Sequence, residues 1–173
     1  MKRLGMLVAA LATFVSFQAS QADESLSAAA NAAYLANNAH KPGVYVRPSG
    51  LQYRVVQYGN GKRPGPLDTV TVYYKGSLIN GKVFDATEPG LPATFPVNKL
   101  IPGWTEALQL MREGDHWELV IPSNIAYGAR GAGDGLVPPD QVLVFDLELI
   151  TVTPAPPKKP GEDQDQDTGS SGY

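Results

Sequence analysis

Large apolar residues and a few polar ones recur in five short segments that could together line a cleft. Two segments flank a Gly-rich stretch at 128–135, with Ile-Ala-Tyr127-Gly before it and Val-Phe145-Asp after it. The other three segments are 72–76, 81–85 and 100–104, and they supply further large apolar groups and a single acid, Asp85. Aromatic and aliphatic groups at the edge of such a stretch favour an apolar cleft rather than a phosphate-binding loop.

The composition excludes several other kinds of chemistry. The 173 residues contain no cysteine, which excludes dithiol redox chemistry and zinc–thiolate sites. The two histidines, His40 and His116, stand in unpaired contexts, so a His-based metal site or hydrolytic centre is not expected. We therefore predict that the protein uses no metal and no cofactor. The net charge, formally −3 and predicted to be −5 once the N-terminal Lys2 and Arg3 are removed, argues against nucleic acid or an anionic membrane surface as a partner.

The N-terminal residues have the pattern of a secretory signal peptide. Lys2 and Arg3 precede an uncharged apolar stretch at 4–17, and Ser20 and Ala22 place small residues at positions −3 and −1 of a cleavage site. The stretch is short for a membrane span, although an uncleaved interfacial helix is the alternative. We predict cleavage after Ala22, giving a periplasmic or secreted protein without stable membrane insertion. Cleavage would change the net charge from −3 to −5.

The rest of the chain predicts a β-rich domain with one internal helix. Alternating apolar and polar residues indicate strands at 51–56, 69–74, 117–121 and 143–150. The pair Asn80-Gly81 is a strong hairpin-turn signal. An apolar helical face is formed by Trp104, Ala107, Leu108 and Met111, and Gly114 is expected to end that helix. An antiparallel sheet with one helix across a face is an α+β fold.

Two further segments flank this domain. Residues 23–40 have a helical period, with Ser25 as the expected N-cap and Pro42-Gly43 as the stop. One short helix cannot form a core alone, so it should pack on the main domain or on another chain. From Pro154 the chain is Pro-rich and then acidic, and we expect disorder. The predicted organisation is signal peptide 1–22, helical segment 23–43, main domain 44–153 and tail 154–173.

In their order along the chain, the five segments resemble the FKBP-type peptidyl-prolyl cis-trans isomerases over residues 51–152. The residues at 48–53, 93–95 and 101–111 are closest to the bacterial macrophage-infectivity-potentiator and FkpA-like branch. The resemblance implies a twisted antiparallel sheet wrapped around one short helix. It also implies an enzyme that speeds rotation about X–Pro bonds, a step that needs no nucleophile, metal or general base.

The resemblance also assigns roles to individual residues. Trp104 would form the floor of a proline pocket, and the Tyr127 hydroxyl and Ile101 N–H would donate to the substrate carbonyl. Asp85 would hydrogen-bond Tyr74 beside the amide being twisted. The predicted catalytic residues are Phe84, Asp85, Ile101 and Tyr127. The predicted substrate-binding residues are Tyr74, Leu100, Trp104, Leu136, Val137 and Phe145, with Leu136 and Val137 at the tip of a loop that overhangs the cleft.

Two departures from the family pattern affect partners and specificity. Only residues 23–40 would precede Lys41 in the mature chain, where the branch usually carries a long dimerising helical region, so we expect a monomer. The pocket-edge Phe of small cytosolic members falls near Ala93, and their loop His has no counterpart at 131–135. Taken singly, the aromatic residues could be ordinary core residues and Asp85 a turn residue. Their joint occurrence favours a pocket.

The predicted function is that of an exported peptidyl-prolyl isomerase that assists the folding of secreted or envelope proteins. Its partners would be proline-containing polypeptides, and macrolides are the inhibitor class that the resemblance implies. The alternative is a holdase chaperone or protein-binding module that uses the same apolar cleft without relevant catalysis.

Overall fold

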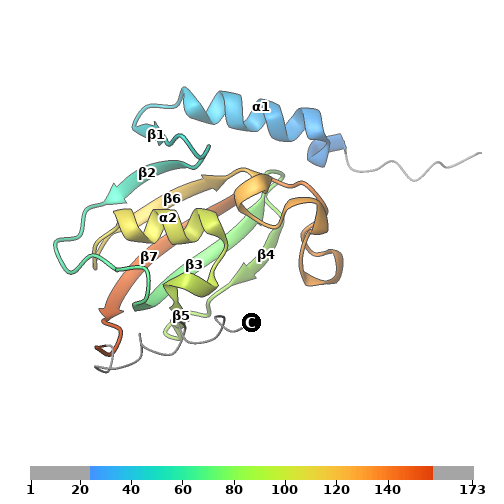
Figure 1. Cartoon of the computed structure of the whole chain (residues 1–173). Coiled ribbons are helices and arrows are strands. Elements are labelled where there is room, and N and C mark those ends of the chain that lie inside the picture. The colour runs from blue at the N-terminus through green and yellow to red at the C-terminus, as the bar shows by residue number, and fades with distance from the viewer. Residues whose placement is uncertain (1–23, 158–173) are drawn as a thin grey trace, which may run out of the picture.

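A computed structural model describes residues 24–157, in which seven strands form a single antiparallel sheet (Figure 1). The strand order is β1-β2-β6-β7-β3-β4. The N-terminal half of β3 pairs with β5, and its C-terminal half pairs with β4. The strands are β1 (Val44–Val46), β2 (Gln52–Gln57), β3 (Thr69–Leu78), β4 (Val83–Ala86), β5 (Ala93–Pro96), β6 (His116–Ile121) and β7 (Leu143–Thr153). The α+β fold is confirmed, and the four predicted strands differ from β2, β3, β6 and β7 only at their ends, whereas β1 and β5 were not predicted.

The helix α2 (Pro102–Leu110) lies across one face of this sheet and closes the core. Its apolar face is buried, as predicted, with Trp104 4% exposed and Ala107 and Leu108 fully covered. The helix approaches the sheet closely because of Gly103, where a Cβ atom would lie 2.5 Å from Ile121 Cγ2. This approach holds the N-terminal end of α2 against β6.

The prediction that Gly114 ends this helix is wrong. The helix ends at Leu110, and the N–H of Met111 caps it by donating to the carbonyls of Ala107 and Leu108. Gly114 lies in the turn that leads to β6, where its φ of 89° suits glycine. This backbone conformation serves the turn rather than the helix.

The second helix, α1 (Ala28–Ala39), packs on the opposite face of the sheet (Figure 1). Ile121 contacts α2, whereas Val120 lines a groove with Tyr34 of α1, because neighbouring strand residues point to opposite faces. The N-cap is Ser27, whose Oγ accepts from the N–H of Ala30 at 3.1 Å, so the expected cap at Ser25 is wrong. A short 3-10 turn, η1 (Glu24–Leu26), precedes it.

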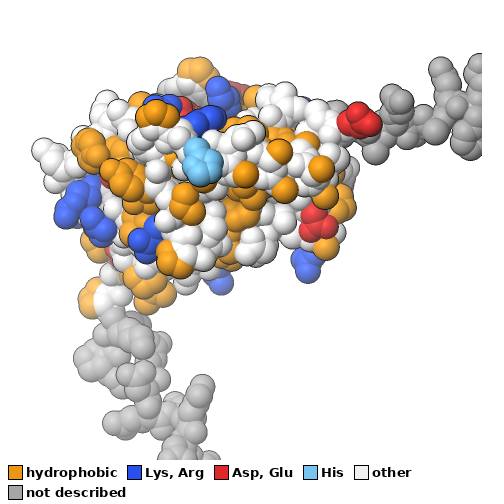
Figure 2. Space-filling model, turned by 90° about the horizontal axis from the view of Figure 1, so that it is seen from above, with side chains coloured by type: hydrophobic (Ala, Val, Ile, Leu, Met, Phe, Trp, Pro, Cys, Tyr) orange, Lys and Arg blue, Asp and Glu red, His pale blue; other side chains and the backbone are white. Residues whose placement is uncertain are grey.

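The outward face of α1 is nearly free of functional groups. Figure 2 looks down on it and shows small hydrophobic side chains with few charges along the helix. The exposed alanines are Ala28, Ala29, Ala32, Ala33 and Ala36. Specific contacts of α1 therefore lie underneath, where Asn31 and Asn38 are buried against the domain. Packing of this helix on the main domain is confirmed.

The predicted hairpin turn at Asn80-Gly81 is confirmed between β3 and β4. The N–H of Leu78 donates to the carbonyl of Lys82 at 2.9 Å, and Gly81 has a φ of 85°. This turn brings β4, which carries Phe84 and Asp85, alongside β3. The turn encoded by Asn80-Gly81 therefore accounts for the pairing of two strands that contribute residues to the site.

The predicted signal peptide and most of the predicted tail lie outside the described residues. Within the described part, the N–H of Ala155 donates to Asp68 Oδ1 at 2.9 Å and fixes the chain just beyond β7. Between residues 24 and 157, neither helix has the length and hydrophobicity needed to cross a membrane.

Candidate active site

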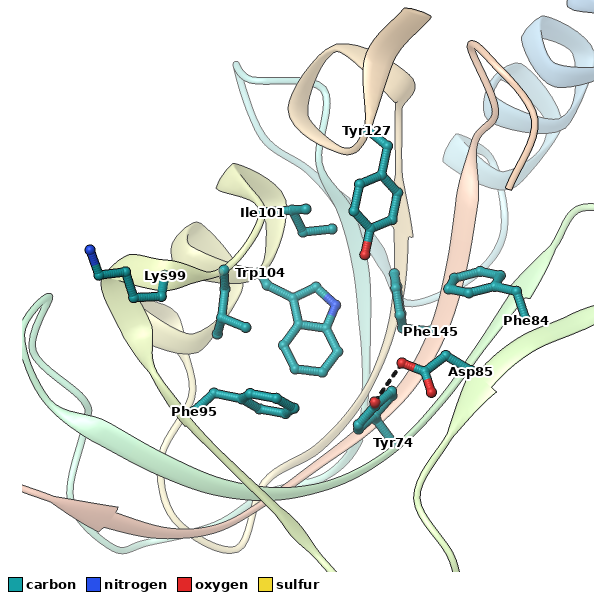
Figure 3. Close-up of a pocket in the computed structure, with 10 residues that line it drawn as sticks. Tyr74, Phe84, Asp85, Phe95, Lys99, Ile101, Trp104, Tyr127 and Phe145 are labelled. Carbon is teal, nitrogen blue, oxygen red and sulfur yellow. Dashed lines mark hydrogen bonds between the residues drawn. The ribbon is translucent and has the colours of Figure 1, made fainter. Parts of the chain in front are cut away.

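A cavity of about 230 Å³ opens between α2 and the β3–β4 side of the sheet (Figure 3). Its lining combines aromatic and aliphatic side chains with one carboxylate and one ammonium group. The lining residues are Tyr74, Phe84, Asp85, Phe95, Lys99, Leu100, Ile101, Trp104, Tyr127 and Phe145. Eight of the ten predicted site residues meet here, from β3, β4, β7, α2 and the loops before and after them.

The floor of the cavity is the indole of Trp104 in the first turn of α2. Three rings meet it edge to face, with centroid distances of 5.2 Å from Tyr74, 5.2 Å from Phe145 and 6.2 Å from Phe95. Edge-to-face contacts of this kind favour one fixed arrangement of rings. The floor is consequently rigid and apolar.

One wall is the pair Phe84 and Phe145, whose rings are perpendicular with centroids 5.7 Å apart. Both rings stand over Gly76, which pairs with Phe145 and Asp85 across its two neighbouring strands. A Cβ atom at Gly76 would lie 2.6 Å from Phe145 Cε1 and 2.7 Å from Phe84 Cζ. Only glycine at this position lets the two rings take the places that they occupy.

The carboxylate is held by a tyrosine at the edge of the cavity. Tyr74 Oη donates to Asp85 Oδ2 at 2.6 Å, as predicted, and Figure 3 shows this bond below the indole. Burial, followed by the hydrogen bond to Asp85, raises the pKa of Tyr74 far above its usual value. The phenol therefore stays a donor throughout the physiological range and orients the carboxylate.

Two further residues of the lining, Tyr127 and Ile101, carry hydrogen-bond donor groups. The hydroxyl of Tyr127 points into it (Figure 3), and burial together with the charge of Asp85 raises the pKa of this phenol. Ile101 is the N-cap of α2, and its N–H finds no acceptor within residues 24–157. The first N–H groups of a helix lack intrahelical partners and are available to a ligand. Tyr127 and Ile101 thus each bring one hydrogen-bond donor group to the lining of the cavity.

Leu136 and Val137 are not brought to this cavity. Val137 is 3% exposed and belongs to the core, while Leu136 is 49% exposed. The loop folds back on itself, because Ala132 and Val137 exchange two backbone hydrogen bonds of 3.0 Å. That pairing turns Val137 inward and leaves Leu136 at the surface away from the lining.

Two lining residues, Phe95 and Lys99, were missed by the sequence prediction. Phe95 lies on β5, two residues after Ala93, and its ring centroid is 6.1 Å from that of Tyr74. Alternation along β5 could have indicated Phe95, since Phe95 is half-buried between exposed Thr94 and Pro96. Lys99 ends the short turn η2 (Val97–Lys99), and its ammonium points away from the other lining side chains (Figure 3).

The chemistry of this lining does not suit a metal. Asp85 is its only carboxylate, and no group of three or more His, Cys, Asp or Glu residues in the described part of the chain could hold a metal ion. What remains is an apolar cavity with two donors and one oriented acid. Such a lining is chemically suited to a small apolar group beside a hydrogen-bond acceptor.

The fold and this cavity define a class of protein in which one helix closes an aromatic cavity against an antiparallel sheet. A family model described as FKBP-type peptidyl-prolyl cis-trans isomerase matches residues 61–150. A second, described as the domain amino terminal to FKBP-type peptidyl-prolyl isomerase, matches residues 5–55. The chain belongs to the FKBP-type peptidyl-prolyl cis-trans isomerase family.

Individual relatives agree with this assignment. Over 124 residues the chain is 53% identical to the "Outer membrane protein MIP" of Legionella longbeachae. The aligned region covers 71% of this chain and 53% of the relative. The chain is 52% identical over 126 residues to the FKBP-type 22 kDa peptidyl-prolyl cis-trans isomerase of Escherichia coli K12, covering 72% and 61% respectively. The chain thus spans little more than half the length of these relatives.

Solved structures show the same fold. The peptidyl-prolyl cis-trans isomerase of Pseudomonas syringae pv. tomato superimposes with a TM-score of 0.68 at 42% identity, covering 73% of this chain and 92% of the other. FkpA of Escherichia coli gives a TM-score of 0.70 at 44% identity, covering 74% and 60%. These matches confirm the predicted family and branch.

Proposed function

We propose that this protein is a peptidyl-prolyl cis-trans isomerase that accelerates rotation about X–Pro bonds in polypeptides. The observation that carries the proposal is the aromatic cavity over Trp104, with the Tyr127 hydroxyl on one side and the Asp85–Tyr74 pair on the other. Uncatalysed rotation faces a barrier of roughly 18–20 kcal/mol because the amide loses its resonance. Lowering that barrier requires interactions that are stronger in the twisted amide than in the planar one.

In this proposal the apolar cavity binds the proline ring, and the polar groups contact the peptide backbone. The proline ring enters the apolar cavity and stacks over Trp104, between the walls formed by Phe84 and Phe145. A planar amide is more charge-separated than a twisted one, so removal from water disfavours the planar ground state. The Tyr127 hydroxyl and the Ile101 N–H hold substrate carbonyls in place while the bond turns. Asp85, oriented by Tyr74, lies beside the rotating amide.

The proposal is tested by measuring cis-to-trans conversion of an X–Pro peptide with purified protein. A rate above that of buffer alone is expected, and a rate equal to buffer would refute isomerase activity and favour the holdase alternative. Tyr127→Phe should lower kcat/KM by about tenfold or more, because one preorganised donor is lost. Tyr58→Phe is the matched control, since Tyr58 is 79% exposed and does not line the cavity.

We further propose that the protein is exported and acts on secreted or envelope proteins. The basic start, the apolar stretch at 4–17 and the small residues before Asp23 support this proposal, as does the name of the Legionella relative. Mass spectrometry of the protein made in a Gram-negative host should find an N-terminus at Asp23. Retention of residues 1–22 in the mature protein would contradict export by a cleaved signal.

Macrolides are the proposed inhibitors of the same cavity. The rim that they would contact includes Phe95, Lys99 and Leu100. A macrolide should compete with the peptide, raising the apparent KM and leaving kcat unchanged. Inhibition that lowers kcat without changing KM would place the macrolide elsewhere.

A further inference from the structure

The buried side chain of Asn31 on α1 is hydrogen-bonded to the segment that precedes β7. Asn31 is 5% exposed, and its Oδ1 accepts from the N–H of Val142 at 2.8 Å. Its Nδ2 lies 3.0 Å from Gln141 Oε1, and it also reaches the carbonyls of Leu26 and Ser27 at 3.1 and 3.0 Å. The side chain of Asn31 thus satisfies helix-start carbonyls and a loop 110 residues away at once.

Gln141 strengthens the same junction from the loop side. It is 8% exposed, and its Nε2 donates to the carbonyl of Leu26 at 3.2 Å and to that of Pro139 at 2.9 Å. The segment 139–142 is therefore held by main chain and side chain against the first turn of α1. Figure 1 shows the N-terminal end of α1 directly above this loop.

The fastened segment closes the loop that starts at Tyr127. The N–H of Asp140 donates to the carbonyl of Gly128, the residue after Tyr127, at 2.9 Å. Asp140 has a φ of 58°, a conformation that a non-glycine residue keeps only where its surroundings hold it. Gly131 approaches the Val137 carbonyl so closely that a Cβ atom would lie 2.3 Å from that oxygen. The loop is therefore closely packed, and it connects the Asn31 junction to Tyr127.

We propose that Asn31 is a positioning residue for the isomerase site. It acts through the segment 139–142 and the Asp140–Gly128 bond to hold the Tyr127 hydroxyl at the cavity, and it makes α1 a support of that site. The inference rests on the proposed isomerase activity. Small shifts are sufficient, because misplacing a reacting group by about 1 Å can cost about 100-fold in rate.

A matched control lies on the same helix. Asn38 is 7% exposed, and its Nδ2 donates to Gln52 Oε1 at 2.9 Å, while Gln52 Nε2 returns a bond to the carbonyl of Leu35 at 3.0 Å. This second amide pair also fastens α1 to the sheet, but it leads to β2 and not to the loop after Tyr127. Asn31→Ala and Asn38→Ala therefore remove comparable buried amides with different connections.

The kinetic test compares these variants in the full chain with a protease-free assay, because a loosened loop would be cut by a coupling protease. Asn31→Ala should lower kcat/KM about tenfold, mainly through kcat, since the apolar cavity is unchanged. Asn38→Ala should stay within about twofold of the unmodified protein. In a Tyr127→Phe background, the loss caused by Asn31→Ala should shrink to less than about twofold, because both changes affect one donor.

Hydrogen exchange gives a readout that needs no activity. Amides at 128–142 should exchange faster in Asn31→Ala than in Asn38→Ala. Gln141→Leu removes the bonds that Gln141 contributes to the same junction and replaces Asn31→Ala if that variant fails to fold. Equal kinetic losses in the two asparagine variants, an undiminished loss in the Tyr127→Phe background, or equal exchange at 128–142 would each overturn the inference. An inactive unmodified protein would instead refute the proposed function.

Discussion

The phenolic oxygen of Tyr74 lies 2.6 Å from Asp85 Oδ2 and donates a hydrogen bond to it at the edge of the cavity. The two residues come from neighbouring strands, β3 and β4, joined by the turn at Asn80-Gly81. The bond fixes the carboxylate, and burial of Tyr74 keeps the donor protonated. The hairpin turn therefore places the phenol donor and the carboxylate acceptor on adjacent strands, where they can form this hydrogen bond.

Removal of this donor should affect catalysis more than stability. Tyr74→Phe keeps the ring against Trp104 but frees the Asp85 carboxylate, so kcat/KM should fall several-fold. The free energy of unfolding should drop by only about 1 kcal/mol, typical of one hydrogen bond. Kinetics and urea unfolding measure the two effects. Unchanged kcat/KM would show that the orientation of Asp85 is irrelevant to the reaction.

The two cavity tyrosines should keep activity constant at alkaline pH. Burial and the nearby carboxylate raise the pKa of both Tyr74 and Tyr127 above the ordinary value of 10.0. Both phenols are donors only when protonated, so the raised pKa values extend their working range upward. The pH profile of kcat/KM should stay flat to about pH 10. A decline centred well below pH 10 would contradict these assignments.

Gly76→Ala should distort the cavity wall. The new methyl group would lie 2.6 Å from Phe145 Cε1 and 2.7 Å from Phe84 Cζ, so both rings must move. Overpacking of this kind costs about 1–3 kcal/mol of unfolding free energy, and KM should rise because the wall is displaced. Gly65→Ala is the control, since its nearest neighbour, Asp68 Oδ2, would be 3.4 Å from the added atom. Equal effects of the two substitutions would refute a specific role for Gly76.

Acid should loosen the chain around the C-terminal end of β7 through two carboxylates. Asp68 accepts the N–H groups of Gly65 and Ala155, and Glu113 accepts those of Val152 and Lys62. These backbone bonds lower the pKa of both groups from ordinary values of 3.8 and 4.5.

Because the folded-state pKa values are lower than the unfolded ones, the stabilisation is present above about pH 4.5 and is lost as pH falls through the folded values. The Tm should therefore fall below about pH 4, and an Asp68→Asn, Glu113→Gln double variant should show a shallower dependence. Thermal unfolding between pH 2 and pH 7 checks this. An identical slope in the variant would mean that other groups cause the acid sensitivity.

Lys99 should set a preference for the charge of residues beside the proline. It is the only lysine in the lining, and its ammonium lies at the outer edge of the cavity, on the side away from Asp85 (Figure 3). Lys99→Glu should lower kcat/KM for peptides with an acidic residue next to proline by about two- to fivefold, and the effect should shrink at high salt because Lys99 is exposed. Lys99→Gln should give an intermediate result. The same change for neutral and acidic peptides would exclude a charge effect.

The sequence alone determined the elements whose signals are local. The strand alternation, the apolar face of α2 and the turn at Asn80-Gly81 each depend on neighbouring residues, so periodicity and turn chemistry were sufficient. Eight of the ten predicted site residues were found together because the family resemblance ordered five separate motifs. The resemblance placed the residues that lie directly on the cavity floor and walls.

Only the tertiary structure decided the features that depend on how distant segments meet. The register of β5 against β3 placed Phe95 in the lining, and the closure of the 128–142 loop turned Val137 into the core. The need for glycine at Gly76 follows from two rings contributed by β4 and β7. The junction between Asn31 and Val142 spans 111 residues, and no local pattern encodes a contact between segments so far apart.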